Sequence, residues 1–76
     1  MLDYFKELKE ILRSEEKVMM EKLISAQESE VIFLNNDVVR RDIIDYKRFL
    51  INQLESLNNS IREIDSKISR IEGRRA

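Results

Sequence analysis

The side chains in this sequence that could take part in chemistry are carboxylates and basic groups, because the chain contains no histidine and no cysteine. This composition excludes thiolate metal sites, redox pairs and imidazole bases. Two pairs of nearby carboxylates, Glu15 with Glu16 and Glu28 with Glu30, have the residue type for acid–base catalysis or metal binding. Residues one or two apart on a helix do not face each other, so neither pair converges on a ligand. The sequence therefore predicts a protein that is not an enzyme and has no cofactor or metal.

A basic cluster in the second half of the chain is the other candidate site. Its members surround Ile44 and Ile51 and are Arg40, Arg41, Lys47 and Arg48, within about 120° of helix surface. Such a cluster could contact phosphates, as paired basic helices do in small RNA-binding bundles. Asp42 and Asp45 interleave with it, and basic residues also flank ordinary apolar interfaces. Nucleic-acid binding is therefore the alternative hypothesis, and a helix interface is the preferred one.

The elements that must position these residues are long helices. There is no proline and only one glycine. Leucine and isoleucine recur in the second half at spacings of 4-3-4-3-4-3, at Leu50, Leu54, Leu57, Ile61, Ile64, Ile68 and Ile71. A seam with this period must be buried against another helix, as in a coiled coil. The ladder predicts that the chain works through helix-to-helix contact.

One break divides the chain into two helices of similar length. It is Leu34-Asn35-Asn36-Asp37, where asparagine and aspartate favour turns and helix caps over helix interiors. We predict a single all-α domain, residues 1–76, with a first helix at about 2–34, a turn at 35–37 and a second helix at about 38–72. Gly73 is the predicted helix stop. Two arms of roughly 50 Å each predict an antiparallel coiled-coil hairpin.

The first helix has a less regular apolar stripe. Its seam residues are Phe5, Leu8, Leu12, Met19 and Leu23, followed by Ala26, Phe33 and Leu34. Glu15 or Glu16 and Glu30 interrupt the stripe, whose period is nearer to 3.6–3.7 residues than to 3.5. Folding at the turn would place Phe5 near Ile68, so that the two stripes meet along their length.

Apolar side chains off the seam predict a further interface. Tyr4, Ile11, Val18 and Ile32 form a second line on the first helix, and Ile24, Val31, Ile44 and Ile51 lie near the turn on the two helices. A two-helix hairpin buries too little apolar surface to offset the entropy of ordering its chain. We therefore expect the last four to bind a second copy, which would give a dimeric four-helix bundle, or a helical client protein.

Composition and charge also bear on location and partners. The sequence has no apolar stretch long enough for a membrane span, and Asp3 and Glu7 argue against a signal or transit peptide. We expect a cytoplasmic protein. The formal net charge is −1, which gives no overall attraction to nucleic acid or membrane.

Several segments together resemble the FlgN-like flagellar export chaperones. They are Leu8-x-x-Ile11-Leu12-x-x-Glu15, Glu21-Lys22-Leu23-Ile24, Leu34-Asn35-Asn36-Asp37 and Lys47-x-x-Leu50-x-x-x-Leu54-x-x-Leu57 with Arg62. The resemblance covers roughly residues 8–64 and implies an antiparallel helical hairpin that holds hook-associated proteins for type III export. Family members continue into a further helix that carries client binding, so the resemblance assigns no client-binding residue here. Tyr46-x-x-Phe49-Leu50-x-x-x-Leu54 also resembles the FliJ-like export stalk, a two-helix coiled coil.

The expected function is helix-mediated protein–protein interaction, with assistance to flagellar or type III export as the leading process. The mechanism would be shielding of an amphipathic client helix in a groove. The alternatives are a dimeric helical bundle that binds RNA or regulates transcription, and a structural coiled-coil spacer.

Overall fold

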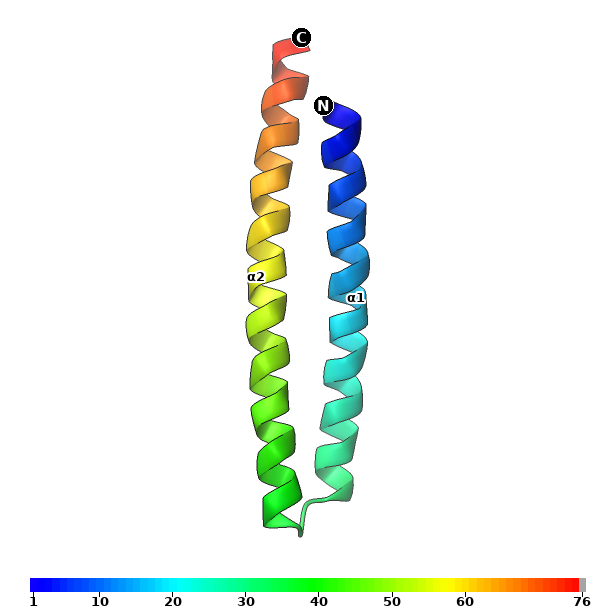
Figure 1. Ribbon diagram of the computed structural model, residues 1–76, viewed down its shortest axis with the longest axis vertical. Coiled ribbons are helices and arrows are strands. Elements are labelled where there is room, and N and C mark those ends of the chain that lie inside the picture. Colours follow the sequence, from blue (N-terminus) through cyan, green and yellow to red (C-terminus); the bar gives the residue numbers. More distant parts are fainter. Residues whose placement is uncertain (76) are drawn as a thin grey trace.

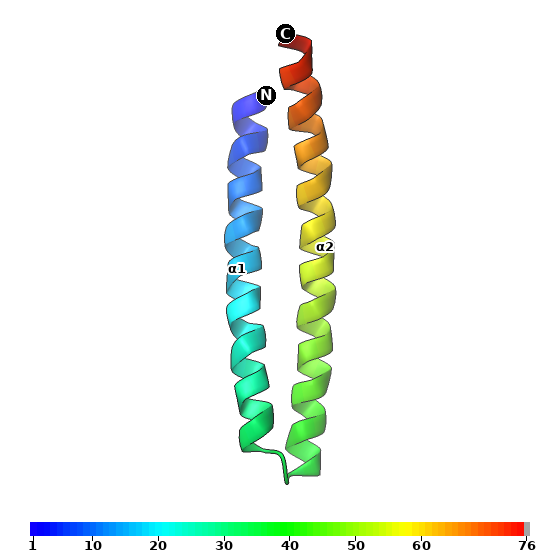
Figure 2. The same cartoon turned by 180° about the vertical axis from the view of Figure 1, so that it is seen from behind.

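The computed structural model describes the backbone of residues 1–75 and the side chains of residues 1–74. Two long helices, α1 (Leu2–Ile32) and α2 (Asp37–Arg75), lie side by side and antiparallel, with both chain ends at the same end of the molecule (Figures 1 and 2). The molecule is a rod of 60 × 14 × 14 Å. The predicted all-α helical hairpin is confirmed.

The turn between the helices is short and hydrogen-bonded. The amide of Phe33 donates to the carbonyl of Ser29, and the amide of Asn36 donates to the carbonyl of Phe33. The Asn36 side chain then caps α2, because its Oδ1 accepts a hydrogen bond from the Val39 amide at 3.2 Å. Asp37 follows in the first turn, where a negative charge complements the helix dipole. The turn residues therefore lie at 33–36, whereas the sequence predicted 35–37, and Phe33 and Leu34 are exposed there instead of extending the seam.

Replacing Asn36 with alanine is expected to lower the free energy of unfolding by about 0.5–2 kcal/mol, because the Val39 amide loses its side-chain acceptor. Urea denaturation followed by circular dichroism measures this change. Asn35→Ala is the matched control, because it removes the same side-chain amide from the neighbouring position. Within the described residues the Asn35 side chain caps no helix. Equal effects of the two substitutions would contradict the assignment of the cap to Asn36.

The C-terminal end of α2 differs from the prediction. The helix continues through Gly73 to Arg75. No described residue has a positive φ angle, so Gly73 does not adopt the left-handed conformation of a glycine cap. A single glycine weakens a helix by only about 1 kcal/mol, which the preceding hydrogen-bonded turns can tolerate.

The ladder of α2 faces α1, as predicted. Leu50, Ile61, Ile64 and Ile68 are buried, and Leu54, Leu57 and Ile71 are partly buried. Leu50 is the most deeply buried side chain, with 1% of its surface exposed. This row supplies most of the core of the hairpin.

The seam of α1 follows the predicted apolar stripe. Its predicted members Phe5, Leu8, Leu12, Met19 and Leu23 are all partly buried. From Leu12 onward the contacting positions are Leu12, Glu16, Met19, Leu23, Ala26 and Glu30, at spacings of 4-3-4-3-4. Steps of three and four residues alternate in this stretch, as they do in the ladder of α2. Glu16 and Glu30 occupy positions at which the sequence predicts that glutamates interrupt the apolar stripe.

Candidate interaction surfaces

An ion pair inside the seam removes one residue from the predicted basic cluster. The Nζ of Lys47 lies 2.7 Å from Oε2 of Glu30, and each side chain is 24% exposed. Lys47 occupies the seam position that precedes Leu50 by three residues. It therefore neutralises a partly buried carboxylate and does not belong to an open phosphate-binding surface, which corrects the prediction for this residue.

The other three members of the basic cluster, Arg40, Arg41 and Arg48, are exposed. Asp42 and Asp45 are exposed among them. The structure therefore presents a mixed charged surface near the turn. Among the described residues, no group of three or more acidic side chains is arranged to hold a metal ion. No helix within residues 1–75 is both long and apolar enough to span a bilayer.

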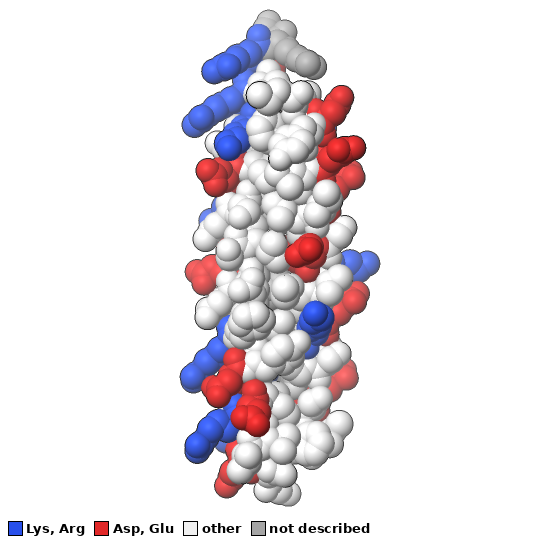
Figure 3. All heavy atoms as spheres, in the orientation of Figure 1, with Lys and Arg blue, Asp and Glu red and all other residues white. Residues whose placement is uncertain are grey.

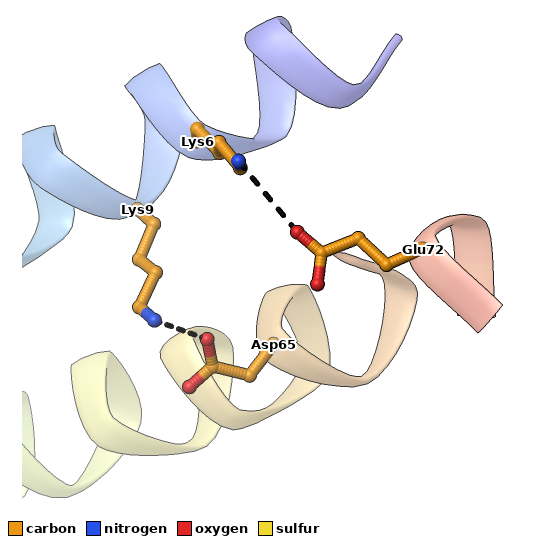
Figure 4. A network of polar contacts seen from close by, with 4 residues as sticks. All are labelled: Lys6, Lys9, Asp65 and Glu72. Atoms are coloured by element: carbon orange, nitrogen blue, oxygen red, sulfur yellow. Dashed lines mark ion pairs between the residues drawn. The ribbon is translucent and has the colours of Figure 1, made fainter. Parts of the chain in front are cut away.

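Two further ion pairs identify one side of the hairpin, which we call the ion-pair face. Near the free ends, Lys9 pairs with Asp65, and the Nζ of Lys6 lies 3.6 Å from Oε1 of Glu72 (Figure 4). All four side chains reach across from one helix to the other on the same side. They fix the register at the free ends, as Glu30 and Lys47 fix it near the turn.

The predicted interface residues lie on the turn-proximal half of the ion-pair face. Ile44 and Ile51 precede Asp65 by 21 and 14 residues, and positions a multiple of seven apart share one line of a coiled-coil helix. Glu10 lines the same hollow as the four residues of the two ion pairs, so Glu10 belongs to the ion-pair face of α1. Ile24 follows Glu10 by 14 residues and Val31 follows it by 21, so both lie on this face as well. Ile24, Val31 and Ile51 are exposed and Ile44 is partly buried. Near the turn the ion-pair face thus combines apolar side chains with Arg41 and Arg48, and near the free ends it is charged.

The opposite side, which we call the groove face, carries a different apolar surface. A groove of about 500 Å³ lies between Val18 of α1 and Tyr46 of α2, and Ser25, Ala26 and Ser29 are among the small residues that line it. Tyr4 and Ile11 lie on the same line of α1 as Val18, at seven-residue intervals, and Phe49 lies one turn from Tyr46. Ile32 continues this line 14 residues after Val18, so the exposed apolar residues of the groove face are Tyr4, Ile11, Val18, Ile32, Tyr46 and Phe49.

Charged residues border the groove face unevenly. In the orientation of Figure 1 this face points toward the reader, and Figure 3 shows it as a largely uncharged band over both helices, with acidic and basic side chains within it. Acidic side chains predominate along the α1 edge (Figure 3). Exposed Glu7, Glu21 and Glu28, spaced by multiples of seven residues, follow that edge.

Sequence reasoning found one line of the groove face but missed its other half. Tyr4, Ile11 and Val18 form a seven-residue repeat that is visible in the sequence. The contribution of Tyr46 and Phe49 was missed, although extending the ladder back from Leu50 to Lys47 and Ile43 would have placed Tyr46 beside the seam. The same extension would have identified Lys47 as a seam residue.

Comparison with known proteins adds no relative. No protein-family model, curated protein or solved structure matches this chain. The assignment of function therefore depends on the surfaces described above.

Proposed function

We propose that this hairpin is a helix-mediated protein-interaction module that pairs with a second copy and holds an amphipathic helix of a client protein. The observation that supports the proposal is the excess of exposed apolar side chains. Five residues form the buried core, whereas fourteen large apolar side chains in the described chain are exposed. Exposed apolar surface on this scale is typical of interaction sites, and neither helix of residues 1–75 covers it.

The groove face is the proposed client site. A third helix can approach the hairpin closely over Ser25, Ala26 and Ser29, because these side chains are small. Val18 and Tyr46 would then contact the apolar side chains of that helix from both sides, in the way that amphipathic helices bind hydrophobic grooves. The acidic α1 edge favours a client with basic residues beside its apolar stripe.

The process that we propose is assistance to flagellar or type III export, in the cytoplasm. This part of the proposal depends on the resemblance of residues 8–64 to the FlgN-like chaperones. A hairpin that covers an amphipathic helix would keep an export substrate from self-associating before delivery. The mechanism needs apolar contact and no catalytic group.

Replacing Val18 and Tyr46 together with alanine is expected to weaken binding of a basic-flanked amphipathic helix by about tenfold or more, because about 1.4 kcal/mol of lost contact gives a factor of ten. The probes are a designed peptide with a leucine stripe flanked by lysine, its glutamate-flanked counterpart, and helical peptides from hook-associated proteins. Fluorescence anisotropy gives their dissociation constants.

The matched control is Met20→Ala with Val38→Ala, which truncates exposed apolar residues outside the groove face and outside the four predicted interface residues. We expect it to leave peptide binding unchanged. Equal binding of the lysine- and glutamate-flanked peptides would contradict the role of the acidic edge. Failure of the hook-associated peptides alone, with the designed lysine peptide bound, would remove the export process and keep the interaction module.

A further inference from the structure

The turn-proximal half of the ion-pair face has a register that suits a second copy of this chain. Because Glu30 contacts Lys47, Val31 lies at about the level of Ile44, and Ile24 lies about seven residues further along at the level of Ile51. Each hairpin therefore presents two apolar layers, with Gln27 and Arg48 between them. We propose that two copies pack these layers together about a twofold axis parallel to the helices, which forms a short four-helix bundle at the turn end.

This twofold axis has a specific electrostatic consequence. It places α1 of one copy against α2 of the other and keeps every residue at its own level along the rod. Glu28 lies opposite the seam of α1, at the outer edge of both faces, and in this dimer Glu28 of each copy lies beside Arg48 of the other. Both residues are exposed, and neither belongs to an ion pair within the described residues. The dimer thus gains two symmetric ion pairs at the edges of its apolar layers.

Contacts between like charges disfavour the competing arrangements. A twofold axis perpendicular to the helices would bring the two Arg48 side chains together when the apolar layers meet. Nearer the free ends, Arg13 and Arg62 lie at about the same level, because Lys9 pairs with Asp65. A dimer joined along its whole length would bring together Arg13 and Arg62 of both copies, which places four arginines at one level. The contact therefore ends near the middle of the rod, and the groove faces and free ends of both copies stay accessible.

This inference rests on the self-pairing part of the proposed function and specifies its geometry. Reversing the charge at either position, by Glu28→Arg or by Arg48→Glu, is expected to raise the dimer dissociation constant about tenfold or more, since each homodimer then holds two like-charge contacts. Mixing the two variants is expected to restore dimers, because a heterodimer of one chain of each variant has opposite charges at both contacts. Sedimentation velocity measures the fractions of monomer and dimer. It is applied to each variant, to their mixture and to the chain that carries both changes.

The control reverses exposed charges on the opposite side of α2, by Glu63→Arg and by Arg70→Glu. These variants should dimerise as the unaltered chain does. Because all four positions are exposed, helicity should stay unchanged, and circular dichroism checks this. If the unaltered chain dimerises and the Glu28 and Arg48 variants dimerise equally well, the proposed geometry is overturned and self-pairing stands. The same conclusion follows if the two variants lose dimerisation and mixing them does not restore it. A chain that is monomeric at every concentration would overturn the inference together with the self-pairing that it specifies.

Discussion

Replacing Leu50 with alanine is expected to lower the free energy of unfolding by about 2–5 kcal/mol, the range for a leucine truncated in a packed core. Leu50 is 1% exposed and lies in the seam against α1. A domain of this size has a small net stability, so a loss of this magnitude should leave much of the chain unfolded at room temperature. Urea and thermal denaturation followed by far-UV circular dichroism measure the effect.

The control for Leu50 is Val38→Ala, which removes aliphatic carbons from an exposed position near the start of α2. We expect a change within about 0.5 kcal/mol, as for other surface substitutions. A Leu50→Ala variant as stable as this control would mean that the two helices do not pack together at Leu50.

Replacing Glu30 with lysine is expected to lower the free energy of unfolding by about 1–3 kcal/mol, because two ammonium groups would then face each other across the partly buried seam. The combined change Glu30→Lys with Lys47→Glu restores opposite charges and should recover most of the loss. Comparing the four chains as a double-mutant cycle gives the coupling energy between the two side chains.

The exposed pair between Lys6 and Glu72 provides the contrast for this cycle. Both side chains are 54% exposed, and exposed ion pairs contribute only about 0–1 kcal/mol. Glu72→Lys should therefore have a much smaller effect than Glu30→Lys, and raising the salt concentration should reduce it further. Similar losses from the two substitutions, or no recovery in the swapped chain, would contradict a seam position for Glu30 and Lys47.

The candidate surfaces were predicted in part from residue type and spacing. Ile24, Val31, Ile44 and Ile51 were assigned to one interface because they lie off the ladder near the turn, and the structure leaves all but Ile44 exposed. Lys47 was assigned to a basic cluster because of its charge and its place on the helix surface around Ile44 and Ile51. Its role changes because Glu30 lies opposite it, and a contact between residues 17 positions apart depends on the folded register.

The sequence by itself determined that this chain is a helical hairpin. The unbroken ladder of α2 requires a partner helix, and the asparagines near the middle of the chain place the turn, so local spacing and capping chemistry are sufficient for both. The apolar stripe of α1 also predicted the side of that helix that meets the ladder. Only the tertiary structure decided what lies opposite the polar position at Glu30, because packing brings Lys47 of α2 to it as an ion-pair partner. Packing also leaves Val18 and Tyr46 beside an open groove, because the faces that remain uncovered depend on how both helices are rotated when they pack.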